Sequence, residues 1–137
     1  MSWEAFEHQA DIGLAVEAPD GESLFVEAGI ALLSLLCDVE RVAERASFEL
    51  TGDASGVEEL LVDWLNDILY LFEGEQVVCR RIEFPDWTPT AYRALLHGEP
   101  ADPRRHELRG IVKAATYHGL AVERGATRWS ARIILDV

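Results

Sequence analysis

The stretch Ser55–Phe84, SGVEELLVDWLNDILYLFEGEQVVCRRIEF, decides the fold class because the spacing of its apolar residues changes along it. In its first half they recur at steps of three and four, which predicts an amphipathic helix. These residues are Val57, Leu60, Leu61, Trp64, Leu65, Ile68 and Phe72. From Gln76 to Phe84 the period is two, which predicts a strand. A helix that leads directly into a strand indicates a fold containing both kinds of element.

Local signals predict where this helix and strand begin and end. Ser55 followed by Glu58 matches a capping box, in which two side chains satisfy backbone groups at a helix start. Gly74 can adopt the left-handed conformation that ends many helices. Pro85 and Asp86 are expected to end the strand after Phe84.

Working outward, the same signals predict one more helix and further strands. The helix is expected from about Glu22 to Cys37, after the turn Pro19-Asp20-Gly21. Strands are expected at residues 3–7, 12–18, 47–50, 76–84, 92–97, 110–123 and 129–137, with a hairpin turn at residues 125–127. Regular βαβ alternation is missing, so we predict an α+β fold, in which two helices pack against a mixed or antiparallel sheet of about six or seven strands. With 137 residues and no internal repeat or linker, the chain is predicted to form one domain, residues 1–137.

The charge balance restricts the classes of partner. Twelve Lys and Arg residues against 25 Asp and Glu residues give a formal net charge of −13. A protein that binds nucleic acid by itself normally carries a basic patch. The one basic cluster, Arg104-Arg105-His106 with Arg109, follows a segment with two prolines and is predicted to be a solvated loop. An acidic surface fits a cation or a basic protein partner better.

Cysteine usage and hydropathy restrict the location. Cys37 and Cys79 belong to no C-x-x-C pair, so both are predicted to be buried free thiols. The N-terminus has no secretory signal pattern, and no apolar run is long enough to cross a bilayer. The sequence therefore predicts a cytoplasmic protein without a membrane partner.

Carboxylates at the chain ends are the first candidates for chemistry. Strand phase puts Val137 on the core face and Asp136 on the opposite face, so the Asp136 carboxylate and the terminal carboxylate can be held close together. Asp11, at the start of another strand, could supply a third anionic group. Such an all-oxygen set suits Ca²⁺ or Mg²⁺. On spacing alone, ordinary surface carboxylates are the alternative interpretation.

Three other polar residues stand near strand ends. His8 fits either a local hydrogen bond in a turn or a functional role. Lys113 lies in an apolar segment and must reach water or an anion. His118 precedes Gly119, where a structural and a functional role are both open. No nucleophilic triad motif and no glycine-rich phosphate loop is present.

Taken together, these segments resemble the archease family. Residues 7–13 are similar to its motif E-H-T-A-D-I-G, with Gln9 in place of the usual Thr. Residues 112–118 resemble V-K-A-x-T-Y-H, and the chain ends, as is typical of the family, on Asp and one apolar residue. The helical segment 65–72 and Gly98-Glu99 also match, whereas the segment 100–109 has no clear counterpart. The resemblance covers essentially all 137 residues.

The resemblance implies an archease-like fold and an accessory protein rather than an enzyme. Archeases activate the RNA-splicing ligase, which joins 2′,3′-cyclic phosphate or 3′-phosphate ends to 5′-hydroxyl ends in tRNA splicing and RNA repair. They promote guanylation and multiple turnover of the ligase, and RNA would be contacted only through that partner. A divalent metal would be bound by Asp11, Asp136 and Val137, with Ca²⁺ expected first and Mg²⁺ or Mn²⁺ as alternatives. Lys113, with His8 and His118, would belong to the ligase activation surface.

Other interpretations stay open at this point. A chaperone-like or nucleic-acid-modification helper would act without a metal. A stand-alone metal-dependent hydrolase would use the same carboxylates with His8 or His118 as base. A purely structural interpretation leaves all these residues on a solvated surface. The sequence does not predict the oligomeric state.

Overall fold

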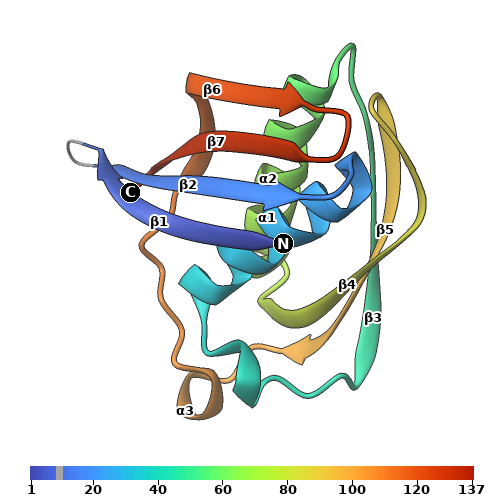
Figure 1. Ribbon diagram of the computed structural model, residues 1–137. Coiled ribbons are helices and arrows are strands. Elements are labelled where there is room, and N and C mark those ends of the chain that lie inside the picture. The colour runs from blue at the N-terminus through green and yellow to red at the C-terminus, as the bar shows by residue number, and fades with distance from the viewer. Residues whose placement is uncertain (9–10) are drawn as a thin grey trace.

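The computed structural model describes residues 1–8 and 11–137 (Figure 1). The described residues form an α+β fold with two main helices and seven strands in two antiparallel sheets, which confirms the predicted fold class. The strands are β1 (Ser2–His8), β2 (Asp11–Ala18), β3 (Ala46–Asp53), β4 (Val77–Thr88), β5 (Ala91–Pro100), β6 (Ala114–Arg124) and β7 (Trp129–Asp136). The main helices are α1 (Gly21–Leu36) and α2 (Val57–Gly74), and the short elements are η1 (Val39–Arg41) and α3 (Pro103–His106).

The strands divide into a four-stranded and a three-stranded sheet. The first, sheet A, has the order β1-β2-β7-β6, and the second, sheet B, has the order β3-β5-β4. The last strand, β7, therefore lies between β2 and β6, with Leu14 opposite Ile133. The first and last strands of the chain, β1 and β7, both belong to sheet A (Figure 1).

The two helices lie between the sheets and contact strands of both (Figure 1). Six aromatic rings contact one another across these layers, at centroid separations between 4.9 and 6.4 Å. They are Phe25, Trp64, Phe84, Trp87, Tyr92 and Trp129. Trp64 is fully buried, and its indole N–H donates to the Phe25 carbonyl at 2.9 Å, which leaves no unsatisfied polar group on that ring. The helices thereby hold both sheets on one core.

Several predicted element ends are wrong. The Ser55–Glu58 capping box does not form: Gly56 is the N-cap of α2 without a side-chain bond, and the Ser55 hydroxyl donates to Glu59 at 2.7 Å. Gly74 stays within α2, and Gln76 takes the left-handed conformation with φ 55°. β4 continues through the predicted break at Pro85 because a register shift between Glu83 and Asp86 accommodates the proline.

The edge strand β6 carries a larger irregularity than the sequence predicts. Residues 110–113 are not strand, and between Thr116 and Ala121 the pairing with β7 shifts. Thr116 is opposite Ile134 and Ala121 is opposite Arg132, so β6 contains extra residues in this interval. Gly119, at φ 64°, supplies the left-handed turn that this bulge requires.

Candidate functional site

Asp11 and Asp136 come together at one end of sheet A. The β2–β7 register pairs Ile12 with Leu135, so Asp11 and Asp136 are the next residues on the two strands. Strand alternation places both on the outer face of sheet A, away from the buried Leu14 and Ile133. Asp136 is exposed and Asp11 is half-buried. The structure thus brings together two carboxylates that lie 125 positions apart in the sequence.

The chain end is held beside this pair. Val137 is partly buried and packs against the main core, as its strand phase predicts. The Lys113 backbone N–H donates to the Asp136 carbonyl at 2.7 Å, which fixes the last residues of β7 to the segment entering β6. Figure 1 shows the C-terminus near the ends of β1 and β2 that meet at His8 and Asp11.

The Lys113 side chain lies on a different side of this corner. It lines a hollow of ≈ 420 Å³ with residues of α2, including Tyr70 and Glu73. Lys113 is exposed, and its ammonium group reaches water, which meets the requirement set by its apolar neighbours. Lys113 therefore joins the Asp136 end of sheet A to the surface of α2.

The two candidate histidines, His8 and His118, lie at different places in sheet A. His8 is the last residue of β1 and pairs with Asp11 in the register, while Gln9 and Ala10 lie outside the described residues. His118 lies in the β6 bulge, and its backbone N–H donates to the Thr116 hydroxyl at 3.3 Å. His118 is thus set back along β6 from the Asp11–Asp136 end.

A hard divalent cation fits the donors at this end chemically. Asp11 and Asp136 offer carboxylate oxygens, the terminal carboxylate is a third anionic group, and the side chains that the structure describes form no ion pair with either aspartate. Within the described part of the chain, no three His, Cys, Asp or Glu side chains gather as a metal-binding group. The expected set contains only two such side chains, Asp11 and Asp136.

Comparison with known proteins gives the family. Residues 3–137 match the Archease protein family (MTH1598/TM1083). The chain belongs to the archease family. It is 36% identical to the protein archease of Methanopyrus kandleri over 140 residues, covering 100% of both chains. It is 32% identical to that of Methanosarcina mazei, covering 98% of this chain and 95% of the relative.

The fold of a solved archease-family protein agrees with this result. The solution structure of Methanobacterium thermoautotrophicum protein 1598 matches with a TM-score of 0.74 and 27% identity, covering 98% of each chain. None of the described helices is long and apolar enough to cross a membrane.

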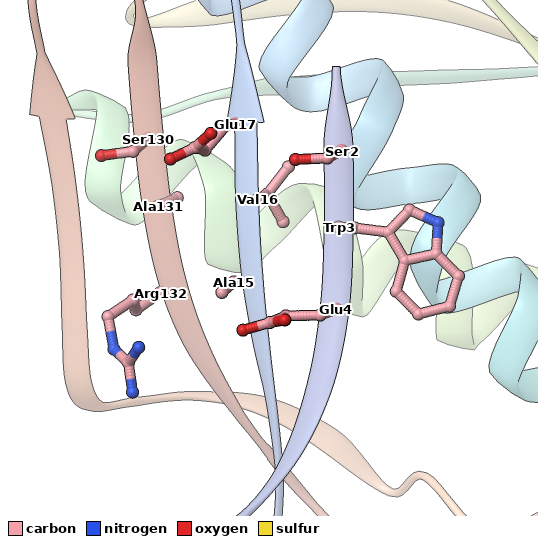
Figure 2. Close-up of a pocket in the computed structure, with 9 residues that line it drawn as sticks. All are labelled: Ser2, Trp3, Glu4, Ala15, Val16, Glu17, Ser130, Ala131 and Arg132. Atoms are coloured by element: carbon pink, nitrogen blue, oxygen red, sulfur yellow. The ribbon is translucent and has the colours of Figure 1, made fainter.

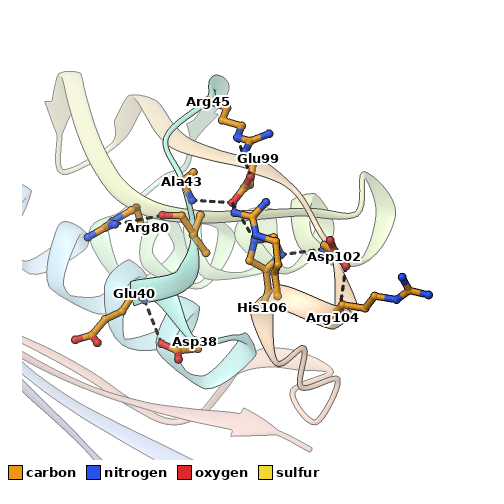
Figure 3. Close-up of polar contacts among 11 residues, drawn as sticks. Asp38, Glu40, Ala43, Arg45, Arg80, Glu99, Asp102, Arg104 and His106 are labelled. Atoms are coloured by element: carbon orange, nitrogen blue, oxygen red, sulfur yellow. Dashed lines mark hydrogen bonds and ion pairs between the residues drawn. The ribbon is translucent and has the colours of Figure 1, made fainter.

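A buried charge cluster, which the sequence did not reveal, surrounds Glu99 near the end of β5 (Figure 3). Glu99 is 2% exposed. Its Oε2 accepts from the Ala43 N–H at 2.7 Å, Arg105 Nη2 at 2.8 Å and His106 Nε2 at 2.9 Å, and its Oε1 lies 3.4 Å from Arg45 Nε. The backbone bond from Ala43, followed by the bond from His106 and the nearby positive charge, lowers the pKa of Glu99 to about 2.

The prediction of a solvated loop for the basic cluster is therefore wrong in part, because α3 forms there and His106 is buried. His106 is fully buried, and its Nδ1 accepts from the Asp102 N–H at 2.8 Å, which leaves Nε2 as the donor to Glu99. Arg104 and Arg105 stay exposed, as expected. The cluster ties α3 to the end of β5 and to the segment before β3, so its role is structural.

A shallow hollow of ≈ 430 Å³ lies on the outer face of sheet A, away from Asp11 and Asp136 (Figure 2). It forms because Ala15, at its floor, is small, while Glu4 and Arg132 stand at its sides. Arg132 is occupied by a cation–π contact with Phe6 at 4.4 Å. None of the predicted site residues whose side chains are described lines this hollow.

Proposed function

We propose that this chain activates an RNA-splicing ligase and does so from the end of sheet A that carries Asp11 and Asp136. One observation carries the proposal: the β2–β7 register makes these two aspartates neighbours beside the chain end. Family membership supports it, because the archease resemblance implies an accessory protein for a ligase that joins cyclic-phosphate or 3′-phosphate RNA ends to 5′-hydroxyl ends. The net charge of −13 agrees with a protein partner rather than with direct RNA binding.

Asp11, Asp136 and the carboxylate of Val137 would hold a divalent metal, with Ca²⁺ expected first and Mg²⁺ or Mn²⁺ as alternatives. When bound, the ion would neutralise these carboxylates and could organise phosphate oxygens at the partner's nucleotide pocket. The chain itself supplies the positions of the donors. β2 and β7 fix the aspartates, and the bond from Lys113 to the Asp136 carbonyl restrains the chain end. An acidic end of this kind would also speed encounter with a basic cleft.

Replacing Asp136 with Ala tests the proposal. We expect stimulation of ligase guanylation to be lost with the fold intact, because Asp136 is exposed and its side chain makes no contact that the core needs. Glu123→Ala is the matched control, since it removes an exposed carboxylate from the opposite end of β6. Equal stimulation by the wild-type protein and the Asp136→Ala variant would refute the proposal.

Calorimetry tests the metal separately from ligase activation. Titration with Ca²⁺, Mg²⁺ and Mn²⁺ should show binding that Asp136→Ala removes. Extending the chain beyond Val137 should also weaken binding, because the terminal carboxylate becomes a peptide carbonyl. An N-terminal extension of the same length is the control. Ligase stimulation without any metal binding would instead support a helper without a metal role.

A further inference from the structure

Helix α2 presents a single stripe of polar and aromatic residues along the edge of sheet A. The stripe consists of Glu59, Asp63, Asn66, Tyr70 and Glu73, which lie three or four residues apart and therefore share one helix face. Asn66 attaches this face to β6: its Nδ2 donates to the Ala115 carbonyl at 3.2 Å, and the Ala115 N–H donates to its Oδ1 at 2.8 Å. The side-chain amide thus pairs with the edge strand as a neighbouring strand would.

Large hydrophobic side chains are exposed on either side of this attachment. Tyr70 is 66% exposed, Tyr117 58% and Ile111 49%, and these are three of the four large hydrophobic side chains exposed among the described residues. Tyr70 lines the hollow that contains Lys113. Tyr117 lies on the other side of Asn66, where partial desolvation and then the charges of Asp63 and Glu59 raise its pKa. Exposed tyrosines of this kind are typical anchors at protein interfaces.

The charge of the same face is unbalanced. Helix α2 contains five acidic residues and no lysine or arginine. In the part of the chain whose side chains are described, no basic residue forms an ion pair with Glu59, Asp63 or Glu73. Glu73 also lies at the helix C-terminus, where a negative charge is unfavourable. Desolvation, followed by repulsion from Glu59, Asp67 and Asp53, raises the pKa of Asp63.

We propose that this α2–β6 face, defined by Glu59, Asp63, Tyr70, Glu73 and Tyr117, docks a basic segment of the partner ligase. The inference rests on the proposed function. It adds a surface that binds the ligase, next to the Asp11–Asp136 end of sheet A that would activate it. Charge complementarity selects the occupant: unpaired carboxylates around exposed tyrosines attract arginine and lysine side chains. The same charges repel RNA, and they repel a second copy of this acidic chain.

Two kinds of variant test the docking face. Tyr70→Ala removes the most exposed aromatic ring, and Asp63→Asn with Glu73→Gln removes two charges while preserving side-chain shape. Glu40→Gln with Glu123→Gln is the matched control, because it removes two exposed charges elsewhere on the surface that form no ion pair with any described side chain. Each protein is titrated by calorimetry into the purified RNA-splicing ligase of the same organism at low and high NaCl concentrations.

We expect Tyr70→Ala to raise the Kd for the ligase about tenfold, as loss of an aromatic anchor does. The double charge variant should raise Kd at low salt and make it less dependent on salt. Both should still reach full stimulation of guanylation at saturating concentration, whereas Asp136→Ala should not. Desolvation and then repulsion disfavour the charged form of Asp63, so the double charge variant is expected to stay folded, and a thermal melt of each variant checks this.

The outcomes separate the two proposals. If wild-type protein stimulates the ligase but the face variants bind with wild-type Kd, or the control pair weakens binding equally, the docking face is refuted and the proposed function stands. If wild-type protein binds through this face without stimulating, the proposed function fails and the docking face stands. Absence of binding by wild-type protein refutes the docking face as well.

Discussion

Replacing Glu99 with Gln is the most direct test of how the α3 segment is held. The substitution preserves shape and leaves one carbonyl oxygen that can accept the three bonds now made to Oε2. It removes the negative charge that faces Arg45 and Arg105. Because the side chain is 2% exposed, solvent cannot replace the lost interaction.

The expected loss follows from the pKa of Glu99. Its lowering from 4.5 to about 2 corresponds to about 3 kcal/mol of stability at neutral pH. Removing one partner of a fully buried ion pair costs about 3–5 kcal/mol, and the lower end applies here because the Arg45 and Arg105 side chains are 69% and 43% exposed and Gln retains part of the hydrogen bonding. We therefore expect Glu99→Gln to lower the free energy of unfolding by about 3 kcal/mol at pH 7.

The stabilisation by Glu99 should decrease as the pH falls. A carboxylate whose pKa is lowered in the folded state stabilises the protein above its unfolded pKa of 4.5, and this contribution is lost as pH falls towards 2. The difference between wild type and Glu99→Gln, measured by urea unfolding, should be constant at neutral pH and fall to less than half by about pH 3.

Glu83→Gln is the matched control for this measurement. Glu83 also contacts an arginine and a histidine, Arg81 and His97, and these bonds likewise lower its pKa. Its side chain is 50% exposed, so solvent screening should make its removal nearly neutral. Equal destabilisation by Glu99→Gln and Glu83→Gln, or a Glu99 effect that is the same at pH 3 and pH 7, would refute the reasoning.

Three further changes test other parts of the fold. Gly98→Ala should destabilise by about 3 kcal/mol or more, because the new methyl group would overlap the backbone of β4, whereas Gly110→Ala has open space and should be neutral; thermal melting compares them. Asn66→Ala should lower the free energy of unfolding by about 1–3 kcal/mol and speed hydrogen exchange at the β6 edge. Unchanged exchange would contradict the role of the two Asn66–Ala115 hydrogen bonds in holding β6. Burial raises the pKa of Cys37 to about 11 and of Cys79 to about 12. Both thiols should therefore react with a disulfide reagent at pH 8 only after unfolding, and rapid labelling of the folded protein would show that they are not buried.

The spacing of apolar residues is sufficient to predict the main helices and strands, but it does not predict the residues at which they begin and end. The apolar spacing of α2 predicts its length because nine of its residues are buried. Its start and end depend on which backbone groups are satisfied: Gly56, not Ser55, is the N-cap, and Gln76, not Gly74, turns left-handed. The division into two sheets was not predicted either, because strand patterning shows which face is buried and not which strands pair.

For the site, strand phase predicted the face of Asp136 correctly, and only the β2–β7 register could add that Asp11 is its neighbour. The Glu99 cluster was missed because its members come from separate segments and its backbone donor, Ala43, has no sequence signature. A buried polar residue such as His106 could not be recognised in a segment whose composition suggests a solvated loop.

The position of β7 between β2 and β6 has a consequence for the order of folding during synthesis. Sheet B and both helices are complete once residue 100 has been made, so they can pack while the rest of the chain is still in the ribosome. Sheet A cannot: residues 11–18 wait for residues 129–136, the strand they pair with. Until then β1 and β2 form a two-stranded hairpin with an open edge, and α1 is the helix that packs against both of its strands. Arrival of the last strand closes that edge and sets Asp11 beside Asp136 in the same event.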